Sequence, residues 1–227
     1  MRYPGESEEY RAARDALRES EVELRRRITA VAAERAALPL GGELPADYEF
    51  DQWDACAGSV RVRRLSELFG ERDTLFLYSF MWVPESQGLG FVGPCPSCTS
   101  IIDGIDGQLP HIEPRIAFAV ASAGGAREFR EHGDRHGWRH ARLLSAARSS
   151  YSVDYQAQDA NGAQWPLATV FVRRDGRIHH FWSSELWSAE RDAGQDPRHV
   201  DFMWPMWAVF DRTPEGRGDF HPSFHYE

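Results

Sequence analysis

The sequence contains no lysine, since all 26 of its basic residues are arginine. This absence excludes Schiff-base chemistry and a lysine general base. Acidic residues outnumber basic ones by 35 to 26, which gives a formal net charge of -9. Nucleic acids and anionic membranes bind proteins through clustered positive charge, so neither is expected as a partner.

Long hydrophobic runs are also missing. No apolar stretch approaches the roughly 20 residues that span a bilayer, and the N-terminal MRYPGESEEY lacks the apolar core of a secretion signal. The sequence therefore predicts a soluble, cytoplasmic protein.

Cysteine is scarce, with three residues in 227. Three thiols are too few, and odd in number, for a structural disulfide framework. A CxxC pair in the cytoplasm is instead typical of redox or metal chemistry, which directs attention to Cys95 and Cys98. Cys56 stands alone and is expected to be a small buried residue.

The chain around the CxxC pair has a clear local pattern. Residues 75–83 are almost wholly apolar and predict a strand buried on both faces. Pro96 suits the first position of a helix, which makes Cys95 the N-cap, and Gly107 predicts the helix end. An apolar stripe faces inward at Cys98, Ile101, Ile102 and Ile105. Cys95 should therefore be exposed near the positive end of the helix dipole and Cys98 shielded.

The N-terminal region, residues 7–38, predicts a long amphipathic helix, with a break where Ser20 and Glu23 form a capping box. Residues 1–44 are interpreted as a helical arm and linker, and residues 45–227 as the main domain. The helix either lies on its own domain or forms a homodimer interface. Its apolar positions recur at sevens: Tyr10, Leu17, Leu24, Val31 and Leu38.

Downstream of the CxxC helix, residues 115–123 predict a buried strand, followed by a helix over 126–136 and a short strand over 143–146. Residues 149–161 are polar and predict a surface loop. Asp175-Gly176 predicts a tight hairpin between strands 169–172 and 178–182. This order of elements predicts an α/β thioredoxin-like fold: a central mixed sheet flanked by helices, with an N-terminal helical extension.

The sequence resembles the DUF899 family, thioredoxin-like proteins predicted to be dithiol-disulfide oxidoreductases. The resemblance covers nearly the whole chain and is carried by these segments: PGESEEYRAARDAL, LSELFGERDTLFLYSFMW, GPCPSC, DGIDG, TVFVRRDGRIHHFWS and HVDFMWPMWAVFDRTPEGRGDF. It implies thiol-disulfide chemistry at Cys95 and Cys98 in a bacterial protein.

Two departures from better-known relatives restrict the interpretation. Thioredoxins place a cis-proline before the strand that leads into the hairpin, where it helps bind the substrate backbone. Ala168 stands at that position, with Pro166 two residues earlier, so peptide docking of this kind is unsupported. Peroxiredoxins need a proline and a threonine where this chain has Gly88 and Val92, so their type of peroxidase activity is not expected.

The function predicted is thiol-disulfide exchange without an organic cofactor, with Cys95 as nucleophile and Cys98 as resolving thiol. The substrate is either a disulfide-containing protein or a small-molecule thiol compound. The predicted substrate pocket comprises Tyr78, Trp82, Pro96, Trp165 and Thr169.

Two alternatives remain open. In the first, copper binds to Cys95 and Cys98 with a histidine, for which His180 and His199 are the candidates. In the second, the protein is a non-catalytic interaction protein that uses its N-terminal helix. Structural zinc is disfavoured because no second histidine follows His111 at ligand spacing. The other polar residues near the motif are expected to be solvated: Asp103, Asp106 and a helix face of His132, His136 and His140.

Overall fold

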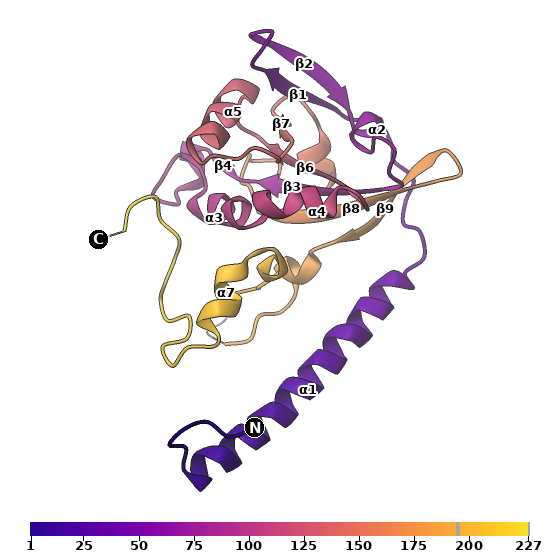
Figure 1. The fold of residues 1–227 in the computed structure, drawn as a ribbon. Helices are drawn as coiled ribbons and strands as arrows, with labels where there is room; N and C mark the ends of the chain where they lie inside the picture. The colour runs from indigo at the N-terminus through magenta and orange to yellow at the C-terminus, as the bar shows by residue number, and fades with distance from the viewer. Residues whose placement is uncertain (194–195, 227) are drawn as a thin grey trace. The chain divides into compact units, whose positions relative to one another are not determined.

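The computed structural model describes residues 1–193 and 196–226, and they form two compact units, Met1–Leu40 and Gly41–Glu227 (Figure 1). The first unit is built on one continuous helix, α1 (Glu8–Ala36), whose N-cap Ser7 accepts a hydrogen bond from the Tyr10 amide. The predicted break at Ser20 is wrong. The Ser20 hydroxyl donates to the Ala16 carbonyl within the helix instead of capping a new one.

The second unit contains a seven-stranded mixed sheet in the order β2-β1-β7-β6-β3-β8-β9. Strands β3, β6 and β7 run parallel, and the other neighbours pair antiparallel. The strands are β1 (Glu49–Asp54), β2 (Ser59–Arg64), β3 (Thr74–Phe80), β6 (Ala117–Ser122), β7 (Leu143–Ser145), β8 (Leu167–Arg174) and β9 (Arg177–Ser183).

Strand β3 separates two hydrophobic clusters, because successive side chains of a strand point to opposite faces. Tyr78 and Phe80 belong to the cluster formed with α3 (Pro96–Ile105), α4 (Leu109–Ile112) and α5 (Ala126–Arg135). Leu75 and Leu77 belong to the cluster formed with α2 (Leu65–Leu68) and α6 (Tyr151–Asp154). Helices thus cover both faces, as predicted.

The segment predicted as a surface loop, residues 149–161, is partly buried. Tyr151 is fully inaccessible, and its ring packs against those of Phe50 and Phe171. The segment is mostly polar, so its composition predicted a loop. One large buried ring is nevertheless enough to anchor a short helix to the core.

The hairpin is as predicted: Asp175 and Gly176 join β8 to β9 with φ values of 52° and 76°, as a type I′ turn requires. Residues 41–44, assigned from sequence to the arm and linker, lie along β9. The Gly41 amide donates to the His180 carbonyl, and the Leu44 amide to the Ile178 carbonyl.

The succession β3, α3, β6, α5, β7 and the β8–β9 hairpin is the thioredoxin-like arrangement that the sequence predicted. After β9 the chain forms the short helices η3 (Glu185–Ser188), η4 (Asp201–Met203) and α7 (Pro205–Phe210), of which η4 and α7 contact α3 (Figure 1). No helix in the described part of the chain has the length and apolar content needed to cross a membrane.

Candidate dithiol site

Cys95 is positioned by a small ribbon next to the end of β3. The strand predicted over residues 75–83 stops at Phe80, and Trp82 and Val83 form β4 (Trp82–Val83), which pairs with β5 (Gly93–Pro94). The ribbon closes the intervening loop, and the Cys95 amide donates to the Met81 carbonyl at 3.1 Å. A strand therefore directly precedes Cys95, but it is β5 and not the sheet strand.

The side-chain amide of Gln164 hydrogen-bonds to the backbone of Trp82, as a neighbouring strand otherwise would. Its oxygen accepts from the Trp82 amide at 2.8 Å, and its nitrogen donates to the Trp82 carbonyl at 2.7 Å. Strand β8 begins only at Leu167, so this amide satisfies backbone groups that the sheet no longer pairs. The end of β3 is thereby fixed against the segment that enters β8.

Helix α3 begins as the sequence predicted. Cys95 is the N-cap, Pro96 occupies the first turn, Cys98, Ile101 and Ile102 are buried, and Ile105 is partly buried. Helix α3 ends at Ile105 with Asp106 as its C-cap, next to Gly107 as predicted, and the chain continues as the 3-10 turn η2 (Asp106–Gln108). Cys95 is less exposed than expected, at 7%, while Cys98 is fully buried.

The two thiols differ in acidity because their surroundings differ. The Cys98 thiol donates to the Cys95 sulfur, and this lowers the pKa of Cys95 to about 7 against an opposing effect of burial. The Cys95 sulfur makes no capping hydrogen bond of normal geometry, yet the amides of Ser97 and Cys98 also favour its thiolate. Burial, followed by the interaction with Cys95, raises the pKa of Cys98 well above the usual value.

Tyr78 lies in contact with the Cys98 thiol. It is fully buried in β3, and its hydroxyl donates to the Cys98 sulfur at 3.3 Å. Burial raises the pKa of Tyr78 well above its usual value, so the phenol stays protonated and remains a donor. Its hydrogen bond, together with the Met81 amide, lowers the pKa of Cys98 and so opposes the effect of burial.

Both cysteines line a cavity of about 900 Å³. Of the predicted pocket residues, Tyr78 and Trp165 line it, as does His199. Much of the remaining wall comes from the C-terminal region, including Trp187, Arg191, Trp204, Trp207 and Arg217. For Trp204 and Trp207, the available sequence signal was the aromatic density of DFMWPMW.

Over residues 2–226 the sequence matches the family described as bacterial proteins of unknown function, DUF899. The chain belongs to the DUF899 family. No curated protein matches it.

Among solved structures, the DUF899 protein is similar to peroxidoxin BcpB from Mycobacterium tuberculosis, with 18% identity, a TM-score of 0.45, and coverage of 76% of this chain and 97% of that one. It is also similar to a cysteine-to-serine mutant of PrxQ from Xylella fastidiosa, with 8% identity, a TM-score of 0.46 and coverage of 76% and 97%. Oxidized Prx3 from Vibrio vulnificus has 14% identity, a TM-score of 0.42 and coverage of 63% and 88%. Such distant likenesses do not identify an activity.

Three predicted pocket residues of the DUF899 protein lie elsewhere. The Trp82 ring packs against Phe129 and His132. Thr169 is buried in β8, where it accepts a hydrogen bond from the Ser183 hydroxyl. Pro96 faces a second cavity on the other side of the helix start.

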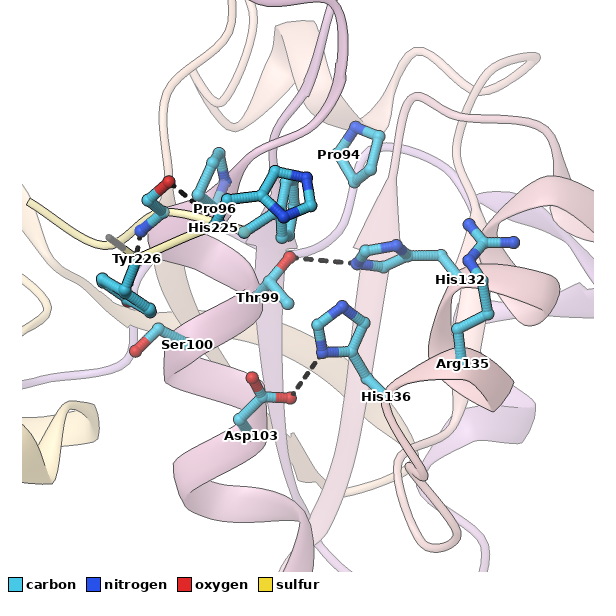
Figure 2. Close-up of a pocket in the computed structure, with 12 residues that line it drawn as sticks. Pro94, Pro96, Thr99, Ser100, Asp103, His132, Arg135, His136, His225 and Tyr226 are labelled. Atoms are coloured by element: carbon cyan, nitrogen blue, oxygen red, sulfur yellow. Dashed lines mark hydrogen bonds and ion pairs between the residues drawn. The ribbon is translucent and has the colours of Figure 1, made fainter.

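This second cavity, of about 600 Å³, lies between α3 and α5 (Figure 2). Thr99 donates to the Cys95 carbonyl at 2.9 Å, so it accepts the 3.0 Å bond from His132, whose proton is then on Nε2. The prediction of an exposed histidine face is wrong for His132, which is buried in the cluster that covers β3. Burial lowers the pKa of His132 to about 4. A neutral His132 therefore links α5 to the first turn of α3.

Asp103 and Asp106 are not simply solvated, contrary to the prediction. Asp103 contacts His136 at 3.2 Å (Figure 2). It also accepts a hydrogen bond from Trp138 Nε1 at 2.7 Å. Asp106 is buried and accepts from three consecutive backbone amides of residues 139–141, at 2.8 to 3.0 Å. Asp103 of α3 and Asp106 of η2 thus attach this part of the chain to the segment that leads into β7.

The histidines proposed as copper ligands are separated. His199 lines the cavity with the cysteines, and its Nε2 contacts the Pro166 carbonyl at 2.6 Å. The His180 ring packs with Tyr155 and Phe171, which belong to the cluster on the opposite face of the sheet from Cys98. Within residues 1–193 and 196–226, no group of three or more His, Cys, Asp or Glu side chains is arranged to hold a metal ion.

Cys56 was predicted to be buried, but it is exposed in the turn between β1 and β2. Its amide donates to the Asp54 carboxylate, which stabilises the turn and directs the thiol away from the core.

Proposed function

We propose that this DUF899 protein catalyses thiol-disulfide exchange, with Cys95 as the attacking thiolate and Cys98 as the resolving thiol. The observation that carries the proposal is the opposed acidity of two adjacent free thiols that line one cavity. With a pKa of about 7, Cys95 is substantially ionised at neutral pH. A thiol with a pKa near the ambient pH combines thiolate population with nucleophilicity.

The reaction takes place in two displacements. The Cys95 thiolate attacks one sulfur of a disulfide, a mixed disulfide forms, and the first thiol leaves and takes up a proton. Cys98 then loses its proton, and its thiolate attacks the Cys95 sulfur. The second thiol leaves and takes up a proton, and a Cys95–Cys98 disulfide remains. The dithiol supplies both electrons.

Tyr78 has a defined place in the second displacement. Burial keeps the Cys98 thiol protonated before the reaction. A protonated thiol is a poor nucleophile, so Cys98 does not attack the substrate before Cys95 does. Once Cys95 is in the mixed disulfide, the Tyr78 hydroxyl and the Met81 amide stabilise the Cys98 thiolate as it forms.

The proposal is tested with two variants, each of which also carries Cys56→Ser so that only one thiol remains. The Cys98→Ser variant should retain a stable mixed disulfide with substrate, detected by mass spectrometry, because its resolving thiol is absent. The Cys95→Ser variant should retain little. In the reduced protein that carries only Cys56→Ser and so keeps both thiols, iodoacetamide should alkylate Cys95 with a half-maximal rate near pH 7, and Cys98 only at distinctly higher pH.

Greater reactivity of Cys98 than of Cys95 at neutral pH would reverse the assigned roles. If neither thiol of the reduced native protein were alkylated until a chelator was added, metal binding would replace exchange as the function.

A further inference from the structure

The backbone beside the dithiol is already hydrogen-bonded within the chain. Trp165 and Pro166 line the cavity with Cys95. The Trp165 amide donates to the Ala157 carbonyl at 2.9 Å, and the Pro166 carbonyl is bound by His199 at 2.6 Å. Gln87 bonds both the amide and the carbonyl of Gln164. An extended peptide gains its affinity by hydrogen-bonding to free backbone groups. The groups of this segment are already paired, so the segment offers little to a peptide substrate.

The thiols also lie within a covered site. Cys95 is only 7% exposed, and η4 and α7 contact α3 on the side that carries the cavity. The volume of about 900 Å³ lies within the range of about 300–1,000 Å³ that is usual for small-molecule sites. A disulfide must bring one sulfur to the Cys95 sulfur in line with the breaking bond, and a small molecule can do so inside such a cavity.

Two aromatic groups form much of the wall. In the first, the Trp187 ring lies 6.0 Å from that of Trp165 and 5.3 Å from that of His199. In the second, the rings of Trp204 and Trp207 are 5.2 Å apart. Ring faces and edges of this kind bind planar or apolar groups favourably.

The charged residues that line the cavity do not favour a ligand of either net charge. Arg217, the most paired of the lining cations, forms ion pairs of 2.6 Å with both Asp201 and Asp211. Charged lining residues of both signs are present: Arg191, Arg198 and Arg217, with Asp192, Asp196, Asp201 and Asp219. Recognition therefore falls to the aromatic walls.

We propose that the substrate is a low-molecular-mass disulfide with an aromatic or other planar apolar body, and not a protein disulfide. This inference rests on the function proposed above. One such disulfide and the reduced dithiol yield two small thiols and the Cys95–Cys98 disulfide, so the electrons balance without a further reductant.

The test is a single turnover of the fully reduced chain, with 4,4′-dithiodipyridine, oxidised glutathione and insulin as probes. Each rate is divided by the rate of the same disulfide with dithiothreitol, which removes differences in intrinsic reactivity. The normalised rate for dithiodipyridine should exceed the other two by at least about tenfold, the equivalent of one good aromatic contact. Its dependence on concentration should saturate.

A matched pair of variants separates cavity binding from chemistry. Trp187→Ala should raise the half-saturating concentration of dithiodipyridine about tenfold and leave the maximal rate unchanged, which also verifies the fold. Trp53→Ala removes a tryptophan of β1 that does not line the cavity, and it should change neither value.

The outcomes distinguish the two proposals. If insulin reacts with a normalised rate equal to that of dithiodipyridine, or if rates rise linearly and Trp187→Ala has no effect, the substrate class is wrong and the exchange function stands. If no disulfide reacts with the reduced protein faster than with dithiothreitol, both proposals fall.

Discussion

Replacing Tyr78 with phenylalanine should slow the second displacement selectively. The change removes one hydroxyl and keeps the buried ring, which has 0% exposure. The lost group is the donor to Cys98 at 3.3 Å, and its loss leaves burial of the Cys98 thiolate less compensated. The pKa of Cys98 therefore rises further, and less thiolate is available to resolve the mixed disulfide.

The magnitude follows from the type of hydrogen bond. A bond to a charged group contributes about 1.5–3 kcal/mol, and each 1.36 kcal/mol on a barrier changes a rate tenfold. A sulfur acceptor at 3.3 Å belongs at the weaker end, so we expect resolution to slow roughly tenfold. Attack by Cys95 should change little, because its pKa is lowered chiefly by Cys98 and not by Tyr78.

The assay follows thiol release from an aromatic disulfide in a single turnover. The variant should release the first thiol at the normal rate and the second in a separate, slower phase, with the mixed disulfide visible by mass spectrometry between them. The slow phase should recover at higher pH, where more Cys98 is ionised. Equal slowing of both phases, or an unchanged second phase, would refute the role assigned to Tyr78.

Three further predictions concern stability, each read from chemical denaturation. Asp106→Ala should lower the free energy of unfolding by about 3 kcal/mol, because three backbone amides lose their shared acceptor. Asp106→Asn, which keeps one carbonyl oxygen, should cost clearly less, and equal losses would contradict the capping role. The pKa of His132 falls to about 4 from 6.5 on folding, so the unfolded chain binds more protons between these values and stability falls as the pH drops below about 6.5. The loss between pH 7 and pH 5 should be roughly 2 kcal/mol smaller in His132→Gln, and an identical pH profile would show that His132 is not held neutral. Gly41→Ala places a Cβ 2.7 Å from the His180 carbonyl oxygen, whereas Gly42→Ala meets nothing within 4 Å. The first should therefore cost about 1–3 kcal/mol and the second less than about 0.5, and similar costs would argue against pairing with β9.

Signals between residues close in sequence were enough to predict the start of α3, the β8–β9 turn and the inward position of Cys98. Cys95 as N-cap follows from Pro96 alone, because proline fits the first helical turn. The turn at Asp175-Gly176 follows from the residue pair itself, because Asp and Gly tolerate the positive φ that both positions adopt. The inward position of Cys98 follows from the helical spacing of its apolar neighbours. Each of these features depends on residues a few positions apart.

Contacts between residues far apart in the sequence determine the surroundings of the two cysteines and the walls of the cavity that they line. Tyr78 reaches Cys98 across 20 positions, and Gln164 binds the Trp82 backbone across 82. The spacing of the histidines predicts an exposed helix face that includes His132, but the packing of α5 on the sheet buries His132 against Thr99. The aromatic walls come from Trp187, Trp204 and their neighbours, far along the chain from the cysteines. Periodicity and spacing report only on neighbours along the chain, so these partners emerge when separate segments pack together and desolvate the groups between them.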